Sequence, residues 1–204
     1  MCSRYRLVKE KIVITIRGRE IEVSVRKRYN VAPQQDMPAL PPDLLPVEMK
    51  WGWKPAWSNQ LLINAKSETV LEKPTFKKQI GNRCLILADG FYEWTTDKTP
   101  VMFTKPDEQP FCFAGLWLET PERRFIILTT APNDTVAPVH NRMPFIVQPA
   151  HYGLWLEAGD LFQTVLASPD TGELKACPVS RELNNVRNER PDLIHPGLAQ
   201  NELF

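Results

Sequence analysis

The feature that most constrains the fold is a period-two alternation of side chains near the start of the sequence. In "KIVITIRGREIEVSVRKRY", residues 11–29, apolar and polar residues alternate on both sides of Gly18. Successive side chains of a β-strand point to opposite faces, whereas the apolar face of a helix repeats every 3.6 residues. The pattern therefore predicts a β-hairpin of residues 11–17 and 20–28 that turns at Gly18.

The rest of the chain continues in short segments separated by turn residues. Helical candidates are few: residues 67–72, with Ser67 as a possible cap, residues 149–158 and residues 160–165. We expect an α+β fold dominated by β structure, with a strongly bent antiparallel sheet or barrel-like core and a few peripheral helices. The strand candidates are residues 46–53, 84–88, 91–95, 100–104, 111–117, 124–130 and 144–147.

A proline-rich stretch follows the hairpin. "NVAPQQDMPALPPDLLP", residues 30–46, offers too few backbone donors for long regular structure, so we predict a loop over the surface. The chain has no internal repeat and no low-complexity linker. We therefore expect a single domain over residues 1–204.

Composition limits where in the cell the protein could act and what it could bind. No run approaches the roughly 18 apolar residues of a membrane helix, and the charged N-terminus is unlike a signal peptide, so we expect a cytoplasmic protein without a membrane partner. Four widely spaced cysteines support neither a disulfide framework nor a metal site. The net charge of +1 hides nine basic against three acidic side chains in residues 1–30. This excess indicates either a solvated charged hairpin or a site for a polyanion.

The second residue is chemically unusual. If Met1 is removed, the chain begins with Cys2, whose free amine and thiol together form a 1,2-aminothiol. Polar side chains also interrupt apolar stretches at Asn64, Glu93 and His140. Strand alternation puts Glu93 on the opposite face from Tyr92, and an inward-facing carboxylate would have a raised pKa suited to proton transfer. A turn asparagine, a surface glutamate and a structural histidine remain the alternatives.

Tryptophans cluster in "KWGWKPAW", which holds Trp51, Trp53 and Trp57 beside two lysines. Such a segment is suited to stacking on unpaired bases or to wedging the end of a duplex. The alternative is a tryptophan-rich core, and we expect at least one of the three to be buried there.

Several of these segments together resemble one protein family. The N-terminal cysteine is followed in order by "RYNVAP", "WGWKPAW", "INAKSET", "ADGFYEW", "FAGLW", "HNRMP" and "NNVRN". In these motifs the chain resembles the SRAP (SOS response associated peptidase) family from Cys2 to about Ile194. Proteins of that family repair DNA by shielding abasic sites in single-stranded DNA. The resemblance is specific because no single motif carries it.

The resemblance assigns roles to individual residues. It implies that Cys2 is the nucleophile and that Asn64, Glu93 and His140 complete the active site. It further implies that Arg4, Lys66 and Arg142 contact phosphates and that Trp51 stacks on a base, and we add Trp53 to the DNA-binding residues. Two positions depart from the family pattern. Ser3 replaces a glycine, and Lys66 replaces an arginine, which keeps the charge but loses the bidentate fork.

The activity that the resemblance implies is a covalent one. The amine and thiol of Cys2 would trap the aldehyde of an abasic site as a thiazolidine, without a metal or nucleotide cofactor, in a monomer whose partner is single-stranded DNA. This chemistry predicts that Cys2 lies beside Asn64, Glu93 and His140 in a pocket open to a strand. Two alternatives remain: an N-terminal-nucleophile cysteine peptidase or amidohydrolase, and a non-covalent single-strand-binding module.

Overall fold

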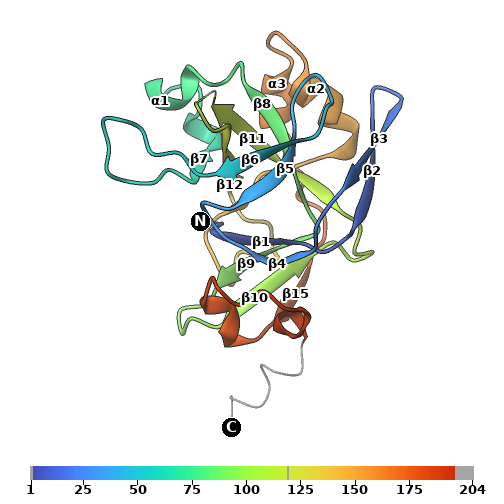
Figure 1. Cartoon of the computed structure of the whole chain (residues 1–204), viewed down its shortest axis with the longest axis vertical. Helices are drawn as coiled ribbons and strands as arrows, with labels where there is room; N and C mark the ends of the chain where they lie inside the picture. The colour runs from blue at the N-terminus through green and yellow to red at the C-terminus, as the bar shows by residue number, and fades with distance from the viewer. Residues whose placement is uncertain (1, 119, 196–204) are drawn as a thin grey trace.

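The structure is a computed structural model that describes residues 2–118 and 120–195. Two β-sheets form its body, and Figure 1 shows a smaller sheet below a strand barrel. The smaller sheet is antiparallel, in the order β15-β10-β9-β1-β4. Its strands are β1 (Arg4–Leu7), β4 (Arg28–Val31), β9 (Gly90–Trp94), β10 (Pro100–Thr104) and β15 (Lys175–Pro178).

The larger sheet closes on itself. Its strands run in the order β12-β6-β5-β8-β11, and β11 pairs again with β12, which completes a five-stranded barrel. Closure removes the free sheet edges, which explains how such short strands form a stable core. The barrel strands are β5 (Asp36–Leu40), β6 (Val47–Trp51), β8 (Arg83–Ala88), β11 (Phe111–Leu118) and β12 (Arg124–Thr130), while β7 (Asn64–Lys66), β13 (Met143–Pro144) and β14 (Ile146–Val147) attach to β12 or β11.

The hairpin lies beside these sheets as a separate two-stranded ribbon, β2 (Lys11–Ile16) and β3 (Arg19–Ser24) (Figure 1). Arg17 and Gly18 form its turn with φ values of 52° and 73°, the positive pair that a type I′ turn requires. The prediction of a hairpin that turns at Gly18 is confirmed. Its second strand is shorter than expected because Arg28 already belongs to β4.

Helices are short and peripheral, and the predicted β-dominated α+β class is confirmed. The predicted helix over residues 67–72 is wrong in extent: only a 3-10 turn forms there, with Lys66 at its N-cap, so Ser67 caps no helix. Among the described helices, none has the length and apolarity to cross a membrane. The helical segments are α1 (Pro74–Lys77), α2 (Tyr152–Leu156), α3 (Phe162–Leu166), η1 (Ser67–Thr69), η2 (Pro149–His151), η3 (Arg181–Asn184) and η4 (Pro191–Ile194).

The proline-rich stretch is not the surface loop that its composition predicts. Its middle forms β5, a strand of the barrel wall between β6 and β8. Met37, Ala39 and Leu40 on this strand are buried. Pro38 is tolerated because it is opposite Glu48 on β6, whereas pairing with β8 begins only at Ala39. The missing N–H of the proline therefore interrupts no ladder to β8.

Trp51 joins the barrel to the smaller sheet. Its ring is fully buried, with ring centroids 5.3 Å from Tyr5 on β1 and 6.3 Å from Phe125, onto which it stacks. Its Nε1 donates a hydrogen bond to the carbonyl of Ile63 at 3.0 Å. The indole thus satisfies its one polar group inside the core, as a buried tryptophan must.

We predict that Trp51→Ala lowers the free energy of unfolding by about 3–5 kcal/mol, because it removes a buried aromatic ring and leaves a cavity. Trp57→Ala is the matched control. The Trp57 side chain is 69% exposed, so its removal should change stability by less than about 0.5 kcal/mol. Urea denaturation of both variants provides the measurement. Equal destabilisation by the two changes would contradict this description of the core.

Candidate active site

Cys2 lies at the start of the strand that the smaller sheet holds in its interior. β1 pairs with β9 on one side and β4 on the other, and the register places Arg4 opposite Tyr92. Continued by two residues, this register places Cys2 opposite Trp94 at the end of β9, next in sequence to Glu93, whose charge acts on the Cys2 thiol. Cys2 is 0% exposed. The described residues therefore leave Cys2 without the expected opening to a strand.

Asn64 contacts Cys2 directly. It begins β7, which pairs in parallel with β12, and its Nδ2 donates a hydrogen bond to the Cys2 carbonyl oxygen at 2.7 Å. The Asn64 Oδ1 is also buried but has no hydrogen-bond partner among the described residues. An unsatisfied buried oxygen is costly, so this atom marks a place where a ligand donor would be stabilised.

Glu93 and His140 lie close together in the site. Glu93 is 2% exposed, and its Oε2 lies 3.9 Å from Nε2 of His140. Burial raises the pKa of Glu93 to about 7, so both of its protonation states are populated near neutral pH. Burial lowers the pKa of His140, which favours the neutral imidazole.

The loop around His140 accommodates either form of the ring. Its Nδ1 lies 3.0 Å from both the backbone N–H and the carbonyl oxygen of Arg142. Unprotonated Nδ1 accepts from the N–H, and protonated Nδ1 donates to the carbonyl. In both cases the ring is held with Nε2 toward Glu93.

The Cys2 thiol is held in its neutral form. Burial, followed by the negative charge of Glu93, raises its pKa. Its Sγ donates to the carbonyl oxygen of Arg4 at 3.6 Å. A thiol in this setting needs a base at the moment of reaction, and the Glu93 carboxylate has a pKa suited to accept the proton.

The three predicted phosphate contacts differ in their surroundings. Arg4 donates to Asn30 Oδ1 and to the carbonyl of Leu183, both at 2.8 Å, so it also fixes the C-terminal segment. Arg142 forms a two-pronged ion pair with Glu68, at 2.6 and 2.9 Å. The Lys66 side chain is exposed, and no hydrogen bond or ion pair joins its ammonium group to another described residue, so its charge is the most available of the three.

The tryptophans divide between core and surface. The stacking role predicted for Trp51 is wrong, because its ring is fully buried against Tyr5 and Phe125 and offers no face to a base. Trp53 is half-buried and packs against the core. Trp57, which we did not assign to the site, is 69% exposed.

A cavity of about 270 Å³ connects Trp57 with the site, because Asn64 and Lys66 also line it. Lys73 contributes a second ammonium group to its wall, and Phe76 forms part of its apolar surface. The sequence signal for Lys73 was weak, since a lysine just before a short helix resembles any surface lysine. Exposed aromatic and cationic groups beside Asn64 provide the kind of surface that unpaired nucleotides prefer.

The "NNVRN" motif, residues 184–188, accepts hydrogen bonds from two residues next to the site. Asn30, from "RYNVAP", donates through Nδ2 to the carbonyls of Leu183, Asn185 and Asn188. Trp94, next to Glu93, donates through Nε1 to Asn184 Oδ1 at 2.5 Å. Two distant motifs thus fix the C-terminal segment beneath β1 and β9.

No group of three or more histidine, cysteine, aspartate or glutamate side chains is arranged to hold a metal ion within residues 2–118 and 120–195.

The chain is similar in sequence and in structure to several known proteins. The family model described as SOS response associated peptidase (SRAP) matches residues 1–186. The abasic site processing protein YoqW of Bacillus subtilis is 34% identical over 189 residues, covering 81% of this chain and 84% of that protein. YedK of Escherichia coli, with the same descriptive name, is 32% identical, covering 83% and 84%. A solved phage-related protein from Bordetella bronchiseptica superposes with a TM-score of 0.72 at 26% identity, covering 87% of this chain and 94% of that one.

We predict that Glu93→Gln stabilises the protein at alkaline pH. Burial raises the pKa of Glu93 from its ordinary value of 4.5 to about 7, so between these values the folded chain binds a proton that the unfolded chain releases. Stability is therefore lost as pH rises through this window, by about 3 kcal/mol at most. Urea denaturation should give similar stabilities at about pH 4 and a more stable variant at about pH 8. The exposed Glu72→Gln serves as control, and an equal effect there would contradict the burial of the Glu93 charge.

Proposed function

The chain belongs to the SOS response associated peptidase (SRAP) family, and we propose that it recognises abasic sites in single-stranded DNA and bonds covalently to them through Cys2. Relatives that match over most of their length are named abasic site processing proteins. The observation that carries the proposal is the cluster at the start of β1. There Asn64 holds the Cys2 backbone at 2.7 Å, and the negative charge of Glu93 acts on the Cys2 thiol.

The first requirement is a free amine on Cys2, which removal of Met1 supplies. An α-amine has a reference pKa of about 7.7–8.0, against about 10.4 for lysine, so a useful fraction is unprotonated at neutral pH. The burial of Cys2 adds a second requirement: the processed end must open to a strand. The cavity at Asn64, Lys66 and Trp57 is the adjoining space through which a nucleotide would approach.

The proposed chemistry has two steps. The Cys2 amine adds to the aldehyde of the ring-opened sugar, and the resulting carbinolamine loses one water to give an imine. The thiol sulfur then bonds to the imine carbon while its proton is transferred to the nitrogen, which closes a five-membered thiazolidine. One water is lost overall and nothing is oxidised or reduced. Because both nucleophiles belong to one residue, the second step is intramolecular and has a high effective molarity.

The neighbouring side chains would move protons and hold the adduct. Glu93, with a pKa near 7, would donate a proton during sugar opening and loss of water and accept the thiol proton during closure. The buried Oδ1 of Asn64 would accept a hydrogen bond from the adduct. Neutral His140 would donate a hydrogen bond from its ring N–H to the sugar oxygen or to the 3′ phosphate.

The strand would be held mainly from the side of the cavity. Lys66 and Lys73 would contact phosphates, and Trp57 would replace Trp51 as the stacking tryptophan. Arg4 and Arg142 remain proposed phosphate contacts, although each already bonds to other residues. Stacking tolerates any base, so specificity would come from the aldehyde and the unpaired strand.

A cysteine peptidase is less well supported by the same site. That chemistry needs a thiolate, which a cationic neighbour normally stabilises. Here burial and Glu93 raise the pKa of the Cys2 thiol. Such a thiol reacts more readily within its own residue than with a separate amide.

We predict that the wild-type protein forms a denaturation-resistant species with abasic single-stranded DNA and none with intact DNA. Cys2→Ser should abolish this species, because serine cannot close the sulfur ring. Cys177→Ser, at a half-exposed cysteine outside the cluster, should leave it unchanged. Denaturing gels of the three proteins provide the measurement. An undiminished band from Cys2→Ser would refute the proposal, and absence of any band would favour the non-covalent module.

We predict that Lys66→Ala weakens binding to intact single-stranded DNA and flattens its salt dependence. Loss of one phosphate contact should reduce the slope of log affinity against log salt by roughly 0.7–1. Fluorescence anisotropy between about 50 and 200 mM salt provides the measurement. Lys27→Ala, in the basic run between β3 and β4, is the control. A smaller slope for Lys27→Ala and an unchanged one for Lys66→Ala would place the DNA on the hairpin instead.

A further inference from the structure

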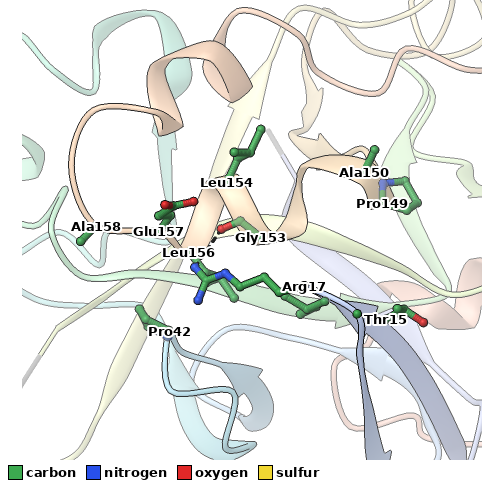
Figure 2. A pocket seen from close by; sticks show the side chains of 12 residues that line it. Thr15, Arg17, Pro42, Pro149, Ala150, Gly153, Leu154, Leu156, Glu157 and Ala158 are labelled. Atoms are coloured by element: carbon green, nitrogen blue, oxygen red, sulfur yellow. Dashed lines mark hydrogen bonds between the residues drawn. The ribbon is translucent and has the colours of Figure 1, made fainter.

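A groove follows one side of strand β2, far from the cluster around Cys2. It consists of two cavities, of about 820 and 220 Å³, which share Thr15 and Pro149. Figure 2 shows the larger one, where the tip of the hairpin faces α2. Together the cavities are lined by every residue from Ile12 to Gly18 and by none from β3.

This lining identifies the groove as the edge of the strand. Successive side chains of β2 point alternately into the core and into solvent: Ile12 and Ile14 are buried, whereas Val13 is 51% exposed. An unbroken run of residues can line one space only if that space lies along the backbone between the two faces. β2 pairs with β3 alone among the described strands, so this edge has no neighbouring strand.

The parity of the hairpin shows which backbone groups face the groove. In a hairpin with a two-residue turn, the closing pair exchanges hydrogen bonds, and bonded pairs then alternate along the strands. Ile16 and Arg19 close this turn. The hydrogen bond from Val25 N to Glu10 O, at 2.8 Å, continues the same parity. The N–H and C=O groups of Val13 and Thr15 therefore point away from β3, toward the groove.

The edge lacks two of the usual protections against pairing, a bulge and a proline. Its register with β3 runs without a bulge from Lys11 to Ile16, and it contains no proline. Natural sheets normally twist, charge or cover such an edge. The opposite wall is largely apolar, with Phe111 and Tyr152 at one end and Leu154 and Leu156 at the other.

Two charged side chains lie at the wide end of the groove. Arg17 donates from Nη2 to the carbonyl of Gly153 at 3.1 Å and has no carboxylate partner among the described residues. Glu157 lines the same cavity, and Figure 2 shows the Arg17 side chain extending from the hairpin toward Gly153. One unneutralised guanidinium favours a single carboxylate on the ligand, whereas Glu157 opposes a continuous polyanion such as DNA.

We propose that this groove binds an extended peptide segment of a partner protein, which adds to β2 as a third strand. Its backbone would pair with Val13 and Thr15, its alternate apolar side chains would face Phe111, Tyr152 and Leu154, and one acidic residue would meet Arg17. Strand addition supplies affinity through main-chain bonds and specificity through alternate side chains. The groove shares no residue with the cluster of Cys2, Asn64, Glu93 and His140, so this binding is independent of the DNA chemistry.

The probe is a phage-displayed library of random decapeptides, panned against the whole protein. We expect enrichment of sequences with alternating apolar residues and an acidic residue near one end. A synthetic peptide of the enriched type, at saturation, should slow hydrogen exchange of the Val13 and Thr15 amides at least tenfold. No enriched class, or protection of amides elsewhere than β2, would overturn the proposal.

Substitutions in the hairpin test whether the peptide binds through backbone hydrogen bonds to β2 or through side-chain contacts alone. Val13→Pro removes the outward N–H and no hydrogen bond to β3, so it should weaken peptide binding at least tenfold, whereas Val13→Thr keeps that donor and should bind normally. Arg17→Glu, at an exposed turn residue, should also weaken binding and guards against misfolding of the proline variant. Equal binding by wild type, Val13→Pro and Arg17→Glu would overturn the proposal. Displacement of the peptide by single-stranded DNA would do the same, since it would make the groove a nucleic-acid site.

Discussion

The site depends on the insertion of β1 between β9 and β4. A buried ion pair fixes this insertion: Arg6 Nε lies 3.0 Å from Asp89 Oδ1, and both side chains are at most 6% exposed. The other carboxylate oxygen of Asp89 accepts the N–H groups of Val8 and Lys9, at 2.6 and 3.0 Å. A slip of one residue would turn every side chain of β1 to the opposite face. The ion pair and these two bonds therefore hold the register that keeps Cys2 beside Glu93.

Burial of that strand also sets the chemistry of its neighbours. The same exclusion of water that stabilises β1 raises the pKa of the Cys2 thiol and brings the pKa of Glu93 to about 7. A neutral nucleophile and a carboxylate poised near neutrality are suited to stepwise proton transfer during ring closure. The stability lost by burying Glu93 is thus linked to its usefulness in the proposed reaction.

Local sequence patterns predicted the hairpin, the barrel strands β6, β8, β11 and β12, and β9 and β10 of the smaller sheet, and they marked Asn64, Glu93 and His140 as polar interruptions of apolar stretches. They did not predict β1, β4, β5, β7 or β15, because each is short and pairs with strands distant in sequence. β5 was missed because Pro38 argued against a strand. Pairing of β5 with β8 begins only at Ala39, so the missing N–H of Pro38 costs no hydrogen bond to β8. Asn64 and Glu93 meet beside Cys2 through parallel pairing to β12 and through the β1–β9 register, and neither pairing has a signal in the local sequence.

The local sequence also could not predict which tryptophan is buried and which is exposed. Trp51 and Trp57 lie six residues apart in one motif, yet one is in the core and the other is at the surface. What decides between them is the parallel pairing of β6 with β12, which places Trp51 opposite Phe125. Likewise the ion pair of Arg142 with Glu68 depends on the approach of the η1 turn to β12, which no spacing in the sequence indicates.

The central claim is that the nitrogen and the sulfur of Cys2 both bond to the same sugar carbon. Tandem mass spectrometry of the nuclease-trimmed, iodoacetamide-treated adduct tests it most directly. The account predicts an N-terminal peptide that starts at Cys2, carries the sugar remnant with net loss of one water, and resists alkylation at sulfur. A remnant on a lysine, or a Cys2 that carries the sugar and is still alkylated, would contradict it.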